Sequence, residues 1–340
     1  MNIRELNATA RAMVARNRGI LAADESNSTI KRRFDAIKLE STEENRRAYR
    51  EMLFTSSDAQ AYISGVIMYD ETLRQKTKEG VPFPVYLAKA GMIPGIKVDL
   101  GAKPLAGYPG ETITEGLDGL RDRFAEYHNM GAKFAKWRAV INIDSGIPSR
   151  YAIDTNAEAL ARYAALAQEA GIVPIVEPEV LMDGAHSLQR CEEVTNAVLD
   201  SVFTRLFAAR VSLEGMVLKP NMVIPGKKSP DQSTPERIAE ATVRTLKRQV
   251  PSAVPGIAFL SGGQSSADAT LHLSLMHASG PLPWPLTFSY GRALQDDALR
   301  AWAGKASGFA GGQKALAKRA KLNGLAAAGE YKSAMESAAA

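Results

Sequence analysis

The segment Gly215-Met216-Val217-Leu218-Lys219-Pro220-Asn221-Met222 combines a short apolar run with a lysine and a proline. The run is typical of a buried strand, and Pro220 marks its end because proline has no backbone N–H to give to a sheet. Lys219 then has two interpretations. Its ammonium group can reach water from the strand end, as many lysines do. Alternatively it can be buried, where an amine loses its proton more easily and becomes a nucleophile toward carbonyls.

Seven further apolar segments alternate with helical stretches along the chain. The eight expected strands cover residues 19–23, 65–68, 95–98, 134–140, 172–176, 215–219, 256–260 and 285–289. The clearest expected helices cover residues 4–16, 43–53, 117–127, 156–170, 187–209, 233–250 and 266–278, with Ser233 and Glu236 as a capping box. Such alternation predicts a parallel sheet. Eight units favour an α/β fold with a closed (β/α)8 TIM barrel and extra terminal helices over two doubly wound halves. We expect a single domain over residues 1–340, with a mobile tail at 332–340.

The composition excludes several classes of protein. The net charge of +5 is small and both signs are mixed, which argues against a nucleic-acid partner. No apolar run is long enough for a membrane span, and the first residues lack the apolar core of a signal peptide. Cys191 is the only cysteine and lies on an apolar helical stripe, so we expect a buried thiol in a reduced, cytoplasmic setting. The four histidines show no metal-ligand spacing, so we expect neither a metal nor another cofactor.

Polar residues follow or end most of the expected strands. They are Asp24, Lys97 with Asp99, Lys136 with Arg138, Glu177 with Glu179, Lys219, Ser261, and Ser289 to Arg292. In a (β/α)8 barrel the carboxyl ends of all strands meet at one face, where active sites lie. Such a concentration of polar groups is difficult to explain by packing. We therefore expect one polar site at that face.

The residue types indicate carbonyl chemistry. Lys97, Lys136 and Lys219 would place three ammonium groups in one mouth, and their mutual repulsion would lower the pKa of the most buried one. A neutral lysine there can form a Schiff base, whose iminium accepts electrons when the adjacent C–C bond breaks or forms. Glu177 and Asp24 are candidates for proton transfer. Alternatively Glu177 only neutralises a lysine, and both roles are compatible.

Two segments predict phosphate binding. Leu260-Ser261-Gly262-Gly263-Gln264-Ser265 places small residues between a strand and a helix, where backbone N–H groups can face an anion. Ser289-Tyr290-Gly291-Arg292 adds a guanidinium group after the last strand. Loops after strands seven and eight are the usual phosphate site of these barrels. Ser26 with Arg32 and Arg33 is a candidate for a second anion site, or simply a solvated helix start.

Segments in order across almost the whole chain make it resemble class I fructose-bisphosphate aldolases. They are GILAADES (19–26), TEENRRAYR (42–50), PGIKVD (94–99), FAKWR (134–138), GIVPIVEPE (171–179), LKPNMV (218–223), FLSGGQS (259–265) and TFSYGRAL (287–294). The resemblance implies a metal-independent (β/α)8 enzyme, usually a homotetramer. It also implies sugar phosphates as small-molecule partners. Its reaction would be reversible cleavage of fructose 1,6-bisphosphate to dihydroxyacetone phosphate and glyceraldehyde 3-phosphate, a step of glycolysis and gluconeogenesis.

The resemblance also implies a role for each candidate residue. Lys219 would form the Schiff base. Glu177 would act as general acid and base, Asp24 would assist C–C cleavage, and Lys136 would handle charge beside it. Contacts to the phosphate at C6 would come from Ser26 and Lys97, and Arg33 would bind substrate. The phosphate at C1 would be bound by Ser261, Gly262, Gly263, Ser289, Gly291 and Arg292. Arg138 and Glu179 fall on polar positions of the family's site.

The sequence departs from the family in a few places. Arg32 stands where lysine is typical, which keeps the charge and changes its geometry. The region of Thr29 also differs, which leaves the preference between mono- and bisphosphate sugars open. Many members end in a tyrosine that exchanges the enamine proton, whereas the last tyrosine here is Tyr331. The carrier of that proton is therefore open.

Other functions remain possible at this level. A transaldolase or an aldolase for another sugar phosphate would share the Schiff-base lysine, and a substrate panel separates these. A non-catalytic barrel would bind sugar phosphates without turnover. A metal-dependent aldolase would be inhibited by a chelator.

Overall fold

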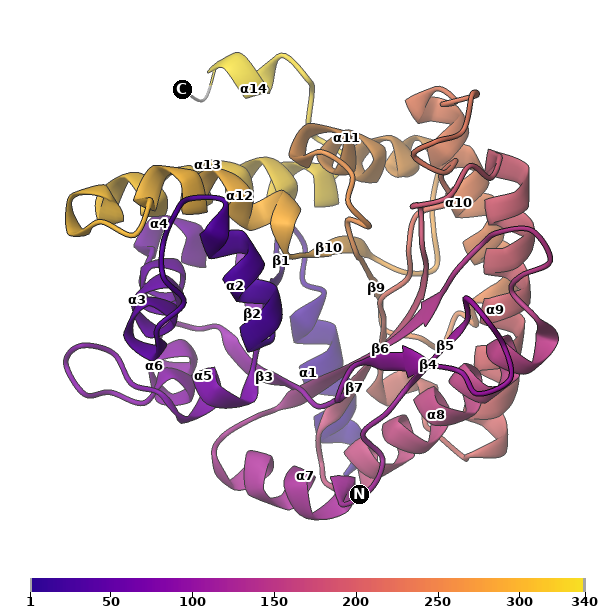
Figure 1. Cartoon of the computed structure of the whole chain (residues 1–340), viewed down its shortest axis with the longest axis horizontal. Helices are drawn as coiled ribbons and strands as arrows, with labels where there is room; N and C mark the ends of the chain where they lie inside the picture. Colours follow the sequence, from indigo (N-terminus) through magenta and orange to yellow (C-terminus); the bar gives the residue numbers. More distant parts are fainter. Residues whose placement is uncertain (1, 339–340) are drawn as a thin grey trace.

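Eight parallel strands close into a barrel in this computed structural model, which describes residues 2–338 (Figure 1). The expected (β/α)8 fold is confirmed. Around the barrel the strands are β1 (Gly19–Ala23), β2 (Ile63–Met68), β3 (Ile93–Lys97), β6 (Phe134–Ile141), β7 (Val173–Val180), β8 (Val217–Leu218), β9 (Ile257–Phe259) and β10 (Leu286–Tyr290). A small hairpin, β4 (Ala102–Pro104) and β5 (Thr112–Thr114), lies outside the barrel.

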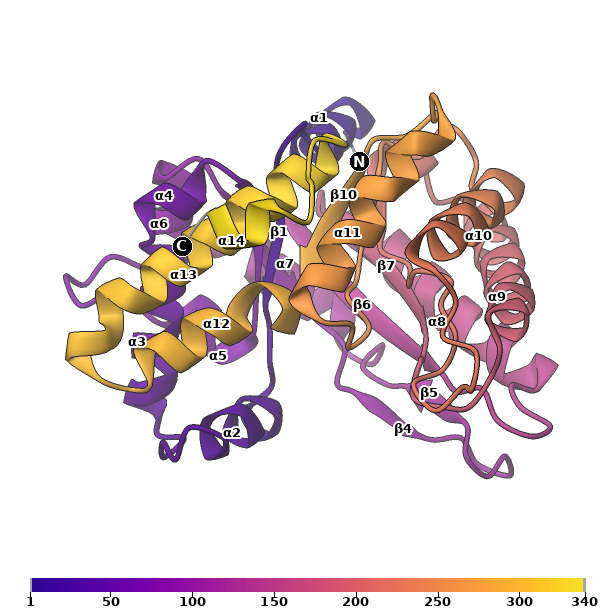
Figure 2. The ribbon, with the colours of Figure 1, turned by 90° about the horizontal axis from the view of Figure 1, so that it is seen from above.

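Helices surround the strands, as Figures 1 and 2 show. They are α1 (Ile3–Met13), α2 (Asn27–Asp35), α3 (Glu43–Phe54), α4 (Ser57–Gln60), α5 (Asp70–Arg74), α6 (Phe83–Lys89), α7 (Leu120–Asn129), α8 (Arg150–Glu169), α9 (Leu188–Ala208), α10 (Pro235–Gln249), α11 (Ser266–Met276), α12 (Arg292–Trp302), α13 (Phe309–Ala327) and α14 (Met335–Ala338). Short 3-10 turns occur at Leu213–Gly215, His277–Ser279 and Ala306–Gly308. Within residues 2–338, none of the helices combines the length and the apolar character needed to cross a membrane.

The start of α10 differs from the expected capping box. Thr234, not Ser233, caps the helix, and its hydroxyl accepts a hydrogen bond from the backbone N–H of Arg237. Ser233 instead adopts a positive φ of 52° and donates its N–H to Asp231. Because Pro235 favours the first helical position, the cap belongs to the residue directly before it.

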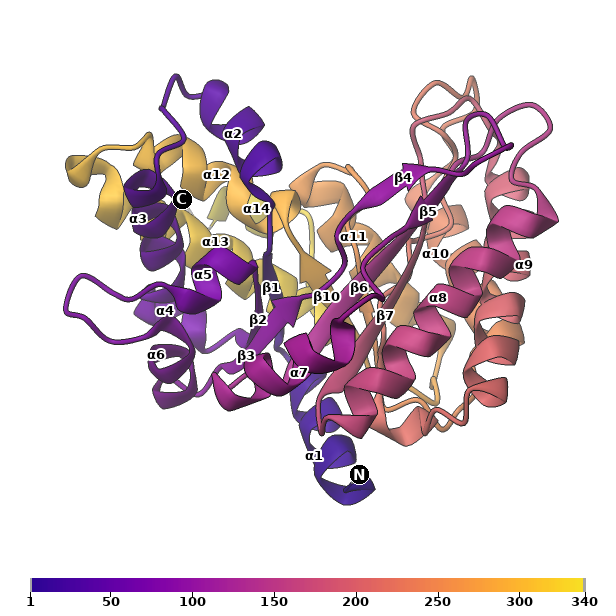
Figure 3. The same cartoon turned by 60° about the horizontal axis from the view of Figure 1, so that its bottom comes forward.

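Helix α1 closes the amino-terminal end of the barrel, below the strands in Figure 3. Its buried Leu6, Ala10 and Met13 belong to the same apolar cluster as the inward-facing residues Phe134 and Ile175 of β6 and β7. The ring of Phe134 occupies the space that a side chain at Gly95 would need, since a Cβ there would lie 2.2 Å from it. With this floor filled, the cavity of the barrel opens toward the carboxyl ends of the strands.

The end of the described chain packs on α13. Glu336 forms an ion pair with the buried Arg319 and accepts a hydrogen bond from Tyr331. The single domain over residues 1–340 and the mobility of residues 332–340 stay predictions, and residues 1, 339 and 340 lie outside the described residues. Cys191 on α9 is buried as expected, and this burial raises the pKa of its thiol to about 11.

Candidate active site

Alternation along the strands explains how the polar residues come together. Inward positions are apolar near the α1 floor and polar above it, as in Phe134, Lys136 and Arg138 of β6. Successive inward residues of β7 are Val173, Ile175, Glu177 and Glu179 by the same two-residue period. Lys219 lies two positions after the inward-facing Val217 of β8. Asp24 lies two positions after Ala22 of β1, so both continue the inward-facing series.

Glu177 and Glu179 lie inside a strand rather than at its end, which corrects the expected boundary. β6 and β7 pair up to Ile141 and Val180, so β6 ends one residue later than expected and β7 ends four residues later. The extra pairing places Arg138 opposite Glu177 in the register. The carboxylates are therefore held by a paired strand and not by a loop.

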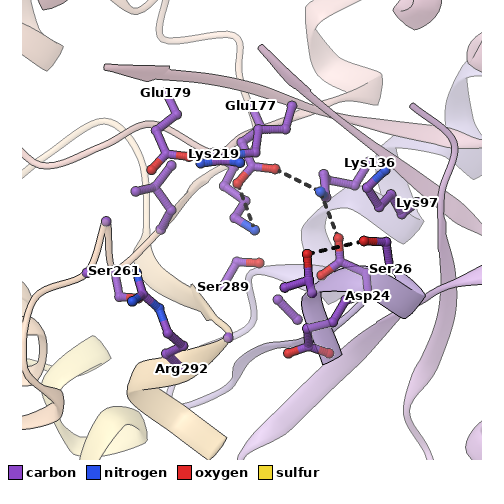
Figure 4. Close-up of a pocket in the computed structure, with 18 of the residues that line it drawn as sticks. Asp24, Ser26, Lys97, Lys136, Glu177, Glu179, Lys219, Ser261, Ser289 and Arg292 are labelled. Carbon is purple, nitrogen blue, oxygen red and sulfur yellow. Dashed lines mark hydrogen bonds and ion pairs between the residues drawn. The ribbon is translucent and has the colours of Figure 1, made fainter. Parts of the chain in front are cut away.

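A cavity of about 540 Å³ opens at this face of the barrel. All fifteen candidate residues line it: Asp24, Ser26, Arg33, Lys97, Lys136, Arg138, Glu177, Glu179, Lys219, Ser261, Gly262, Gly263, Ser289, Gly291 and Arg292. In Figure 4, Lys219 and Glu177 lie between Ser261 and Arg292 on one side and Lys97 and Ser26 on the other. The structure thus brings together the residues that the sequence pattern selected.

Lys219 is buried, so the interpretation with its ammonium group in water is wrong. Its side chain is 4% exposed, and its Nζ lies 3.1 Å from Oε1 of Glu177. Its backbone N–H donates to the carbonyl of Val176 at 2.8 Å, which continues the pairing of β8 with β7. The other oxygen of Glu177 lies 3.3 Å from Nζ of Lys136. Glu177 therefore joins two lysines.

Crowding of the three lysines is expected to lower the pKa of the most buried one, and Lys136 shows a shift in the opposite direction. Its Nζ lies 2.7 Å from Asp24, in addition to Glu177, and 3.8 Å from Asp99. Burial alone would lower the pKa of Lys136, but these carboxylates raise it far above its ordinary value. These carboxylates therefore favour the charged form of Lys136. Sequence reasoning counted the lysines but could not show which carboxylates approach each of them.

Asp24 is the matching anion. Burial alone would raise the pKa of Asp24, but the ammonium groups of Lys136 and Lys219 outweigh it and hold the pKa well below the ordinary value. Because the folded-state pKa is depressed, the pair stabilises the fold above the unfolded-state pKa of about 4, and that contribution is lost as the pH falls toward the folded-state value.

We expect Asp24→Asn to lower the free energy of unfolding most near neutral pH. The gap from the wild type should narrow as the pH falls below about 4, because the wild-type carboxylate then loses its advantage. Urea unfolding of both proteins across this range measures the gap. A gap that stays constant with pH would show that Asp24 does not act through its charge.

One side of the cavity is suited to an anion. Gly262 and Gly263 have φ values of 60° and 88°, a conformation that favours glycine and turns backbone N–H groups outward. Helix α12 begins at Arg292 beside them. The Ser289 hydroxyl is buried and has no hydrogen-bond partner within residues 2–338. These groups can donate to the oxygens of a phosphate.

The opposite side contains a residue that the sequence reasoning missed. Glu25, 7% exposed, forms ion pairs with Arg33 at 2.5 Å and with Arg50 of α3 at 2.7 Å. Arg33 is thereby fixed at the cavity wall. Ser26 and Thr29 share a hydrogen bond of 3.1 Å at the start of α2. Glu25 lies between the candidate residues Asp24 and Ser26 in the sequence. Its role in holding Arg33 becomes visible only from its second ion pair, with Arg50 of α3.

Comparisons with known proteins agree across the chain. The family model described as glycolytic, fructose-bisphosphate aldolase class-I, matches residues 5–340. The chain belongs to this family. A probable fructose-bisphosphate aldolase class 1 of Xanthomonas campestris is 58% identical over 333 residues, covering 98% of this chain and 100% of that protein. Fructose-bisphosphate aldolase B of Gallus gallus is 54% identical, covering 96% and 90%. A solved structure of fructose-bisphosphate aldolase from Plasmodium falciparum, in complex with TRAP and a small molecule inhibitor, superposes with a TM-score of 0.96 at 49% identity, covering 97% of this chain and 96% of that one.

Membership of the class I aldolases selects among the functions that the sequence left open. The reaction is aldol cleavage of fructose 1,6-bisphosphate through a lysine Schiff base, and the substrates are sugar phosphates. Among the described residues, no three His, Cys, Asp or Glu side chains are grouped as a metal ion would need. The absence of a metal or another cofactor stays a prediction.

Proposed function

We propose that Lys219 carries the Schiff base in the aldolase reaction. The observation that supports this choice is the difference in partners among the three cavity lysines. Lys136 is held charged by three carboxylates, and Lys97 is bound by Asp99 and its backbone carbonyl. Lys219 has one carboxylate within 4.0 Å among residues 2–338, and that carboxylate is shared. Its Nζ faces Oε1 of Glu177, the oxygen that does not contact Lys136, so a proton can pass directly between Lys219 and Glu177.

Glu177 receives that proton in the proposed mechanism. Transfer from the Lys219 ammonium to Oε1 yields a neutral amine and a carboxylic acid. The amine attacks the C2 carbonyl of the ketose, and Glu177 returns its proton to the hydroxyl that leaves as water. The iminium that results is positively charged, and the carboxylate of Asp24 is negatively charged at neutral pH. The negative charge of Asp24 attracts the positive iminium and so favours its formation.

Cleavage breaks the C3–C4 bond and leaves its electron pair on the iminium, which becomes an enamine. The C4 hydroxyl gives its proton to Glu177, and the aldehyde product forms. The ammonium group of Lys136 forms ion pairs with both Asp24 and Glu177 and so holds these carboxylates in position. Protonation of the enamine and hydrolysis then release the ketose phosphate and restore Lys219.

The two ends of the cavity are proposed to hold the two phosphates. Ser261, Gly262, Gly263, Ser289, Gly291 and Arg292 surround the phosphate at C1. Ser26 and Lys97 bind at the C6 end, and Arg33, Arg138 and Glu179 bind the substrate elsewhere in the cavity. The placement of both groups around one cavity supports this assignment.

Borohydride reduction tests the proposal. With fructose 1,6-bisphosphate present, borohydride should reduce the iminium and leave a permanent adduct, which peptide mapping places on Lys219. Protein treated without the sugar is the control. An adduct on Lys136 or Lys97, or none, contradicts the proposal.

We also propose a homotetramer in the cytoplasm, on the resemblance to the family. Sedimentation of the purified protein measures the first, since four chains of 36.6 kDa give a distinct mass. Cell fractionation measures the second.

A further inference from the structure

Two loops at the mouth of the barrel are joined by backbone hydrogen bonds beside the loop Ser261–Gly263, which we call the phosphate loop. The segment after β8 donates three backbone hydrogen bonds to the segment after β7. Gly226 donates to His186 at 2.8 Å, Lys227 to Met182 at 2.7 Å, and Lys228 to Gly184 at 3.0 Å. A Cβ at Gly226 would lie 2.1 Å from the Gly184 carbonyl oxygen, so this approach requires glycine. The backbone of Lys227 is thereby fixed.

The Lys227 side chain extends from these hydrogen-bonded loops toward the phosphate loop. Its Nζ lies 2.8 Å from the point where a Cβ of Gly263 would be, and a terminal nitrogen of Arg292 lies 3.0 Å from the same point. The two cations are therefore less than about 6 Å apart, on one face of the loop. Like charges so close repel each other, and a dianionic phosphate beside them relieves that repulsion.

The present partner of Lys227 is a replaceable one. Nζ lies 2.8 Å from Oδ1 of Asp183, whose side chain is 65% exposed. Exposed ion pairs of this kind contribute little to stability. The ammonium group can exchange this carboxylate for a phosphate oxygen with little loss.

We propose that Lys227 is a further phosphate-binding residue, which adds an ammonium contact to the phosphate at C1 and so favours ketoses that carry one. This rests on the proposed function, in which the loop Ser261–Gly263 and Arg292 hold that phosphate. Lys227 lies outside the residues that the sequence pattern selected. Its contribution is to binding, because its ion pair is with Asp183, whereas Glu177 is paired with Lys136 and Lys219.

Kinetics in the direction of condensation test the role of Lys227. Lys227→Met keeps the length of the side chain and removes the charge. We expect the KM for dihydroxyacetone phosphate to rise about fivefold to tenfold, as for loss of one charged contact to phosphate. The KM for glyceraldehyde 3-phosphate and kcat should stay unchanged. Lys227→Arg should restore most of the lost affinity, and the difference should shrink at high salt.

Two control variants separate a phosphate contact from a structural one. Lys228→Met removes the neighbouring exposed charge and should leave both KM values unchanged. Asp183→Asn breaks the ion pair but keeps the Lys227 ammonium, so it should not raise the KM for dihydroxyacetone phosphate. An equal rise of the KM for dihydroxyacetone phosphate in Asp183→Asn and Lys227→Met would show that Lys227 acts structurally, through its ion pair with Asp183. That result would overturn the proposal.

The remaining outcomes are also decisive. An unchanged KM for dihydroxyacetone phosphate in Lys227→Met, or an equal rise for both substrates, overturns the role of Lys227. Neither result bears on the proposed Schiff base at Lys219, because the borohydride adduct of the wild-type protein tests that function separately. Thermal unfolding of each variant shows whether it is folded, and Lys227→Gln offers a second substitution at this exposed position.

Discussion

Replacing Lys219 with methionine should lower kcat for cleavage of fructose 1,6-bisphosphate on the order of 10⁴-fold or more. Removal of the group that forms a covalent intermediate leaves no alternative route of similar rate. Methionine fills nearly the same volume in this buried position. Glu177 keeps its ion pair with Lys136, so no carboxylate is left alone in the cavity. A coupled assay of triose phosphate production measures the loss.

The matched control for this variant is Lys136→Met. Both proteins should be poorly active, but borohydride with substrate should still label Lys219 in Lys136→Met, at a lower rate, and label nothing in Lys219→Met. Circular dichroism confirms that each variant is folded. Activity of more than a small fraction in Lys219→Met would contradict its assignment.

Glu177→Gln should give the second largest effect, a fall in kcat of about 10²–10⁴-fold. The amide keeps the size of the side chain but cannot accept the Lys219 proton or return one to the leaving water. Both formation of the iminium and its hydrolysis should slow. Single-turnover trapping with borohydride measures the first step, and steady-state turnover measures the whole.

Glu179→Gln is the control for Glu177→Gln. The two glutamates lie on the same face of β7, but Glu179 pairs with Arg138 and contacts neither Lys136 nor Lys219 within 4.0 Å. Its loss should alter substrate binding with a much smaller change in the rate of trapping. Equal slowing of trapping in both variants would mean that the charge of the β7 face matters, rather than proton transfer by Glu177.

The barrel was predictable because its evidence is local. Apolar runs such as residues 19–23 and 172–176 alternate with helical stretches, and each can be recognised without knowledge of its neighbours. The site followed from the same pattern, since a polar residue two positions after an inward-facing apolar one must also face inward. Lys219 after Val217 is such a case.

The partners of these residues could not be predicted, because they depend on elements far apart in the sequence. Asp24 meets Lys136 across the barrel, and Arg50 of α3 reaches Glu25 behind the cavity wall. At Lys136 the nearby carboxylates outweigh the repulsion from the neighbouring lysines and raise its pKa. The position of Lys227 likewise depends on two loops that approach only in the folded chain.

The position of α1 also bears on how the protein could be attached to a solid support. This helix packs at the closed end of the barrel, and the side chain of Asn7 donates to the carbonyl of Glu214 there. Figure 3 places the start of the described chain at that end, opposite the loops that surround the cavity. A bead or an electrode linked at residue 2 would therefore leave the entrance facing the bulk solution, so that sugar could diffuse in and triose out without obstruction by the support.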